Sequence, residues 1–223
     1  MAKDRIQVLV IYDDYWHPAE VISKGLKTFS PPDITLDFVR DAKDILTVAR
    51  IRKYDVIMNC KCNNITAANT HPWFDAGVTE VGPSEFAAYV RSGGGFLSVH
   101  SGNAFYREND CPEYIDFVGN YFVKHPPRCD ILVSPAGAHP ITDGIQPFTI
   151  RDEHYEIFVT APDAHQILKT ESAPGGCQNG GYVRSMGDGR LCVLTPGHIQ
   201  DVWENQHYRQ LLASAIRWCA RRI

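Results

Sequence analysis

Four of the nine histidines in this chain follow segments with the composition of buried β-strands, and their imidazoles are well suited to catalysis or metal binding. These residues are His17, His100, His154 and His198. In an open α/β sheet the carboxyl ends of parallel strands meet at one edge, where ligands bind. We therefore expect one histidine cluster at that edge, with a carboxylate beside it from Asp152, Glu153 or Asp201.

Two kinds of chemistry could use such a cluster. Neutral imidazoles with a carboxylate bind zinc or a similar divalent ion, and an ion with an open position activates water or polarises a carbonyl group. Without a metal, imidazoles titrate near neutral pH and act as general acid and base. The sequence contains no HExxH or CxxC motif that would favour the metal. Any one histidine taken alone is more often a hydrogen-bonded core residue than a functional group.

His100 ends the segment SGGGFLSVH, in which a three-glycine turn leads into a short apolar strand. A sharp strand-to-helix turn is a place where enzymes display a reactive side chain. Gly102, two residues later, permits such a turn and a close approach of the backbone. The alternative is that the glycines only end a helix and that His100 only bonds to the backbone. The other histidines shift the balance toward a functional site.

The first half of the sequence alternates between strands and helices, which is typical of βαβ units around a parallel sheet. Apolar runs predict strands over 6–12, 35–39, 54–59 and 96–99. Helical spacing of apolar residues predicts helices over 18–29, 42–51 and 83–91. The polar connection over 61–82 is long enough to be a functional loop, and it contains amides beside aromatic residues.

The second half of the sequence adds short strands to this parallel core. A helix is predicted over 111–122, followed by strands over 130–133, 148–151, 155–160, 166–170, 181–186 and 190–195. Gly187-Asp188-Gly189 indicates a hairpin between the last two strands, and an amphipathic helix is predicted over 206–221. We expect a single domain over 1–223: an α/β fold with an open parallel sheet, helices on both faces and antiparallel strands in its C-terminal half.

Composition limits the partners. The net charge of −4 and the 44% of hydrophobic residues are those of an ordinary globular protein, and no nucleic-acid partner is expected. The sequence shows no signal-peptide pattern and no apolar run of membrane-spanning length, so no membrane partner is expected. Seven irregularly spaced cysteines predict free thiols, and Cys60-Lys61-Cys62 lacks the spacing of a zinc motif. We expect a cytoplasmic protein.

Several segments resemble the ThuA-like proteins, which are associated with trehalose utilisation. They are residues 12–18, GGGFLSVHSG at 93–102, HPITDG at 139–144, DEHY at 152–155, and Gly197-His198 with Trp203. The resemblance spans nearly the whole chain and implies the flavodoxin-like fold of the class I glutamine amidotransferase-like superfamily. The amidotransferases carry a cysteine nucleophile where this chain has His100, and a glutamate where it has Gln200. Glutamine hydrolysis through an acyl-enzyme is therefore not expected.

The resemblance implies an enzyme that acts on a disaccharide or an oxidised sugar, such as a 3-keto-glycoside made by a partner dehydrogenase. An imidazole can remove the acidic proton next to a ketone, which begins an elimination, a hydration or an epimerisation. The expected catalytic residues are His100, His198, His154 and Glu153. A divalent metal such as zinc, if used, would be held by His100 and His198, and no nucleotide cofactor is expected. The expected substrate-binding residues are Asp13, His17, Ser101, Asn103 and Tyr155.

Two other functions stay open from the sequence. A noncatalytic carbohydrate-binding or regulatory module would bind sugar without forming product. A metal-dependent hydrolase of a nonsugar substrate would act without exchange of carbon-bound protons. The identity of the substrate depends on the pocket shape formed by the 61–82 connection and by the glycine-rich segment 174–181, which is expected as a loop. The sequence also leaves open whether the protein is a homo-oligomer.

Overall fold

Alternate residues of the first strand pack on opposite faces of a central sheet, and both sets are apolar. Val8 and Val10 belong to one hydrophobic core, and Leu9 and Ile11 belong to a second. A strand that is covered on both faces needs apolar side chains in both directions, which is why this segment is a continuous apolar run. The computed structural model describes residues 5–40, 46–63, 72, 74–75, 77–107 and 110–223.

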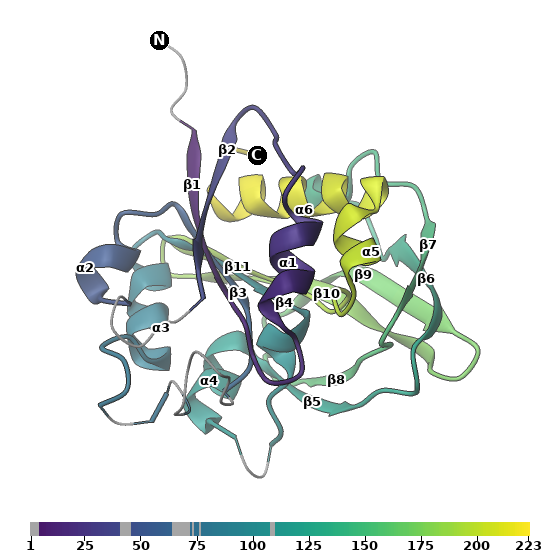
Figure 1. Cartoon of the computed structure of the whole chain (residues 1–223), viewed down its shortest axis with the longest axis horizontal. Helices are drawn as coiled ribbons and strands as arrows, with labels where there is room; N and C mark the ends of the chain where they lie inside the picture. The colour runs from purple at the N-terminus through teal and green to yellow at the C-terminus, as the bar shows by residue number, and fades with distance from the viewer. Residues whose placement is uncertain (1–4, 41–45, 64–71, 73, 76, 108–109) are drawn as a thin grey trace.

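Within these residues a nine-stranded sheet forms in the order β2-β1-β3-β4-β11-β10-β9-β6-β7 (Figure 1). The first five strands of that order are parallel to one another: β1 (Ile6–Tyr12), β2 (Ile34–Val39), β3 (Val56–Cys60), β4 (Gly95–Val99) and β11 (Gly189–Leu194). Counted along the chain, these five have the order 2-1-3-4-5, which is that of flavodoxin-like sheets. The predicted α/β fold with a parallel sheet is confirmed.

The other four strands of the sheet are antiparallel to their neighbours: β10 (Gly176–Met186), β9 (His165–Ser172), β6 (Cys129–Pro135) and β7 (Phe148–Asp152). A separate antiparallel pair consists of β5 (Asn120–Lys124) and β8 (Glu156–Val159). The predicted hairpin joins β10 to β11, and its turn contains Gly187 with a φ of 59° that favours glycine. At β11 the parallel half therefore gives way to the antiparallel half.

Helices cover both faces of the sheet (Figure 1). The core that contains Val8 is shared with α1 (Ala19–Gly25), α5 (Gln200–Glu204) and α6 (Gln206–Cys219). The core that contains Leu9 is shared with α2 (Val48–Ile51), α3 (Pro83–Arg91) and α4 (Pro112–Val118). Asn205 accepts two backbone N–H groups at the start of α6, which places the beginning of that helix where the sequence predicts it.

Several predicted elements are wrong in part. The helix expected over 18–29 ends at Gly25, and the helix expected over 42–51 begins only at Val48, where Thr47 caps it, within the described residues. The helix expected over 111–122 ends at Val118, because Gly119 adopts a φ of 93° and the chain continues as β5. The glycine-rich segment 174–181 was expected as a loop, but from Gly176 onward it is the first part of β10 and pairs with β9. Residues 41–45, in the helix predicted over 42–51, lie outside the described residues. So do residues 64–71, 73 and 76, and the prediction of a functional loop over 61–82, with His71 and Trp73, therefore stays a prediction.

The topology brings the ends of several strands to one edge of the sheet. In doubly wound sheets the crevice beyond the carboxyl ends of the strands, at the point where the strand order reverses, is the usual ligand site. His17 lies between β1 and α1, and His198 lies between β11 and α5. His100 begins the short 3₁₀ helix η1 (His100–Asn103) directly after β4. Among the described residues, no helix combines the length and the apolar character needed to cross a membrane.

Candidate functional site

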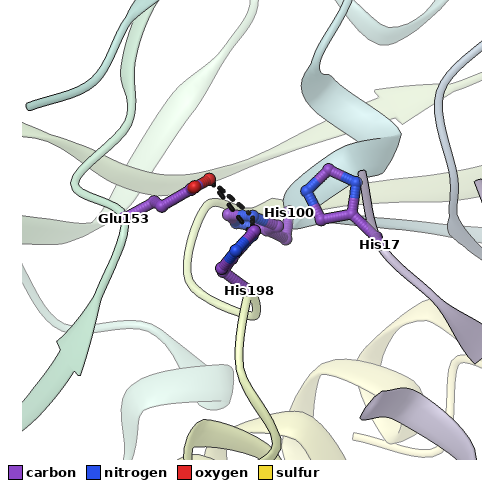
Figure 2. A group of neighbouring side chains, drawn as sticks. All are labelled: His17, His100, Glu153 and His198. Atoms are coloured by element: carbon purple, nitrogen blue, oxygen red, sulfur yellow. Dashed lines mark hydrogen bonds and ion pairs between the residues drawn. The ribbon is translucent and has the colours of Figure 1, made fainter. Parts of the chain in front are cut away.

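Four side chains from distant parts of the chain meet at this edge (Figure 2): His17, His100, Glu153 and His198. His100 Nε2 lies 3.4 Å from His198 Nδ1 and 3.5 Å from Glu153 Oε2. His198 Nδ1 lies 3.2 Å from the same carboxylate oxygen. The ring of His17 lies 4.9 Å from that of His100 and 5.1 Å from that of His198, measured between centroids. The structure thus brings together three of the four strand-end histidines.

The backbone of His100 is held in an unusual conformation. Its φ of 45° lies in the left-handed region, which residues other than glycine seldom adopt and which often marks a functional position. Nδ1 of His100 donates a hydrogen bond to the Thr195 carbonyl at 2.8 Å, so Nε2 is the nitrogen that faces the cluster. The turn also needs Gly102, because a Cβ there would lie 2.5 Å from the Asn59 carbonyl oxygen.

A buried aspartate orients His17. Asp14 Oδ1 lies 2.7 Å from His17 Nδ1, and it also accepts the backbone N–H of His17 at 3.0 Å. Asp14 Oδ2 accepts the backbone N–H of Cys62, just beyond β3. A carboxylate only accepts hydrogen bonds, so His17 carries its proton on Nδ1. Its Nε2 is buried and has no hydrogen-bond partner among the described residues.

The other half of the cluster comes from the C-terminal half of the chain. Glu153 follows β7, and its Oε2 lies 3.6 Å from His125 Nε2 as well as facing His198. Asp152 accepts the backbone N–H groups of Gly197 at 2.7 Å and His198 at 3.0 Å. The two neighbouring carboxylates therefore make different contacts. Asp152 binds the backbone of the loop that carries His198, and Glu153 contacts the His198 ring.

The charges in the cluster shift one another's pKa values. Burial alone would lower the pKa of His100, but the hydrogen bond and charge of Glu153, with the charge of Asp152, raise it above the usual value. Burial would raise the pKa of Glu153, but the hydrogen bond with His100 and the nearby imidazoles lower it to about 2. Burial and the charge of His100 lower the pKa of His198 to about 4. The cluster therefore combines an ionised Glu153 with two imidazoles whose pKa values shift in opposite directions, upward for His100 and downward for His198.

A pocket of about 520 Å³ opens beside the cluster. His17, Glu153 and His198 line it, whereas the side chain of His100 is 2% exposed and lies behind them. The rest of the wall combines aromatic and polar side chains, among them Trp16, Asn63, Tyr106, Asp110, His125 and Tyr155. Trp16 is 66% exposed and Tyr106 51% exposed, so both rings are accessible to a ligand. This lining suits a small molecule that has both apolar faces and polar groups.

The predicted substrate-binding residues divide into two groups. His17 and Tyr155 line the pocket, and the Tyr155 ring stacks on His100 with centroids 4.1 Å apart. Asp13, Ser101 and Asn103 are buried outside the pocket wall. Asp13 accepts a backbone N–H at the start of α1, Ser101 donates to the end of β3, and Asn103 ties β4 to β11. These three side chains support the elements around the site.

His154 lies apart from the cluster. Its Nδ1 is 2.6 Å from Ser172 Oγ and its Nε2 is 3.0 Å from Thr170 Oγ1, both on β9. Burial lowers the pKa of His154. Adjacent residues in extended chain point in opposite directions, which explains why Glu153 enters the cluster and His154 does not. Asp201, another candidate carboxylate, is exposed on α5.

Asp14 and His125 also belong to the site, although neither was predicted from the sequence. Asp14 had a usable signal, since it is an acidic residue directly after a buried strand and three residues before His17. His125 had none, because it lies just beyond β5, a strand that the helical pattern concealed. Its Nδ1 donates to the Pro126 carbonyl at 2.8 Å, which leaves Nε2 directed at Glu153.

Fold and site together define a class of protein: a doubly wound α/β fold with histidines and a glutamate at the carboxyl edge of its parallel strands. The chain belongs to the ThuA family, described as trehalose utilisation, whose sequence model matches residues 7–219. This confirms the resemblance seen in the sequence.

Solved structures show the same fold. A ThuA-like protein from Bacteroides uniformis is 20% identical with a TM-score of 0.72, and the match covers 98% of this chain and 93% of that one. A ThuA-like protein from Parabacteroides merdae is 15% identical with a TM-score of 0.75, covering 98% and 90%. A cytoplasmic protein from Salmonella typhimurium LT2 is 13% identical with a TM-score of 0.67, covering 96% and 99%. Comparison with curated proteins gave no match.

Proposed function

We propose that this chain is an enzyme that acts on a disaccharide or an oxidised sugar in the pocket beside the histidine–glutamate cluster. The family's link to trehalose utilisation supports a sugar as the substrate. The observation that carries the proposal is the pocket itself, which is lined by the exposed Trp16 and Tyr106 together with Glu153 and His198. Aromatic rings cover the apolar faces of a sugar, and polar side chains bond to its hydroxyl groups.

The reaction class that fits this wall is removal of a proton next to a sugar carbonyl group. Such a step needs a base, and it needs positive charge or hydrogen-bond donors near the oxygen on which negative charge develops. We assign the stabilisation of that charge to His198, which lines the pocket, supported by the buried His100 beside it. His125 moves the proton, because its Nε2 faces the pocket wall next to Glu153 and its Nδ1 is already bonded to a carbonyl.

Thiol chemistry does not fit the same site. His100 occupies the strand end where glutamine amidotransferases display cysteine. Cys62 lines the pocket and Cys60 ends β3, but both are buried, and burial with the charge of Asp14 raises the pKa of each thiol far above its usual value. A neutral, buried thiol is a poor nucleophile.

The test uses disaccharides and glycosides carrying a ketone at carbon 3, incubated with the protein in deuterated water and followed by NMR. We expect deuterium to enter the carbon next to the ketone and product to form, and His125→Gln to slow both. Binding without exchange or product would instead support a carbohydrate-binding module. Product formation without exchange would support a hydrolase.

A further inference from the structure

We infer that His17, His100, Glu153 and His198 form a binding site for one divalent transition-metal ion, with zinc as the reference ion. The sequence predicted His17 as a substrate-binding residue, and the inference adds it to the ligand set. The inference concerns the protein alone and does not depend on which substrate the pocket binds.

Three of the ligand atoms already have the spacing of a tetrahedral site. His100 Nε2, His198 Nδ1 and Glu153 Oε2 form a triangle with sides of 3.4, 3.5 and 3.2 Å. Metal bonds of ~2.0–2.1 Å at tetrahedral angles place ligand atoms about 3.3 Å apart. With His17 as the fourth member, all ligand atoms lie within 4.8 Å of one another. Three imidazoles and a carboxylate are a donor set that zinc and related ions prefer.

The unpartnered Nε2 of His17 supports a metal site independently of the spacing of the other three ligand atoms. Its side chain is 6% exposed, and its Nε2 has no hydrogen-bond partner among the described residues. Buried polar atoms without a partner are rare, because they lose hydrogen bonds to water without replacing them, and a bound water or ion is one way to satisfy them. A metal ion in the cluster would satisfy this nitrogen.

The supporting contacts select the ring nitrogens that a metal would need. Asp14 holds the Nδ1 proton of His17, and the Thr195 carbonyl holds the Nδ1 proton of His100. Each neutral ring therefore offers the lone pair of Nε2 toward the cluster. Ligating histidines almost always show this arrangement, with the second nitrogen bonded to a carboxylate or a carbonyl.

The charge around the cluster also favours a cation. Asp14 and Asp152 are buried, one bonded to the ring of His17 and the other to the backbone N–H of His198, and Glu153 is 14% exposed. A dication would offset these carboxylates in an environment where charge is poorly screened. When bound, the ion would polarise a carbonyl or hydroxyl group of a molecule in the pocket, because His17, Glu153 and His198 also line that pocket.

The experiment measures metal binding on the full chain. Metal is removed with a chelator, and zinc is titrated against a coloured competing chelator, with elemental analysis of the reloaded protein. We expect one zinc ion per chain. His17→Gln, His198→Gln and Glu153→Gln should each weaken zinc affinity by about 100-fold or more, beyond the 10–100-fold typical of supporting residues. The control His139→Gln removes a half-buried histidine elsewhere and should leave affinity unchanged.

X-ray absorption on the zinc-loaded wild-type protein gives a readout that does not depend on whether the variants fold. We expect a shell of nitrogen and oxygen with several imidazoles. Failure of the wild type to bind zinc, unchanged affinity in folded His198→Gln and Glu153→Gln, or sulfur in the shell would each overturn the inference. These results are separate from the sugar experiment, so the proposed function can fail while the metal site stands.

Discussion

Asp14 Oδ1 lies 2.7 Å from Nδ1 of His17, and both side chains are almost fully buried. The same carboxylate also accepts backbone N–H groups from its own loop and from Cys62, just beyond the end of β3. Burial would raise the pKa of Asp14, but its hydrogen bond with His17 and the charge of that ring lower it. The ionised carboxylate thus joins two strand ends and sets the direction of one imidazole.

Replacing this carboxylate tests its effect on His17. Asp14→Asn should weaken zinc affinity by about 10–100-fold, because a neutral amide holds the His17 proton less strongly. Competition with a coloured chelator measures the change. Asp13→Asn is the matched control, since Asp13 is also buried but accepts a backbone N–H of α1. Equal losses in the two variants would show that the effect is one of general stability.

The turn after His100 should be sensitive to a single added methyl group. A Cβ at Gly102 would lie 2.5 Å from the Asn59 carbonyl oxygen and 2.7 Å from Ser98 Oγ. Gly102→Ala should therefore lower the free energy of unfolding by about 1–3 kcal/mol, measured by urea denaturation. Gly137→Ala is the control, because a Cβ there meets nothing within 4 Å. A stability for Gly102→Ala equal to that of the control would contradict the close approach.

His154 should make stability depend on pH. Burial lowers the pKa of His154 in the folded chain below the usual 6.5, so the unfolded chain binds a proton more readily. Its contribution to stability is complete above about pH 6.5 and is lost as the pH falls toward the lower folded pKa. We expect wild type to lose more stability than His154→Gln between about pH 7.5 and about pH 5.5. Denaturant titrations at both pH values measure this, and equal losses would refute it.

His125→Gln should separate proton transfer from metal binding. We expect turnover of a keto-sugar to fall by about 10²–10⁴-fold, the range for loss of a general acid or base, while zinc content stays at the wild-type level. Steady-state kinetics and elemental analysis provide the two readouts. His165→Gln, an exposed histidine on β9, serves as the control. If His125→Gln lost zinc, His125 would belong to the ligand set.

The accuracy of the sequence predictions follows the local pattern of each element. The strand predicted over 6–12 matches β1, because a strand buried on both faces is a continuous apolar run. The helix predicted over 83–91 matches α3, because a helix buried on one face has apolar residues at helical spacing. The helix over 111–122 fails after Val118, where Gly119 ends the helix and the next residues form β5. A short apolar run is compatible with a helix or with a strand. Here residues 120–124 form a strand because they pair with β8.

Local sequence patterns were enough to predict the parallel α/β core and the positions of His17, His100 and His198 after strands, because burial and strand ends leave such patterns. Which carboxylate joins the histidines depends on the packing of distant segments. That packing selected Glu153, directed His154 toward β9 and brought His125 to the pocket. It also assigned the free ring nitrogens through Asp14 and the Thr195 carbonyl. These outcomes depend on distances and side-chain directions between segments far apart in the chain, and periodicity contains no information about them.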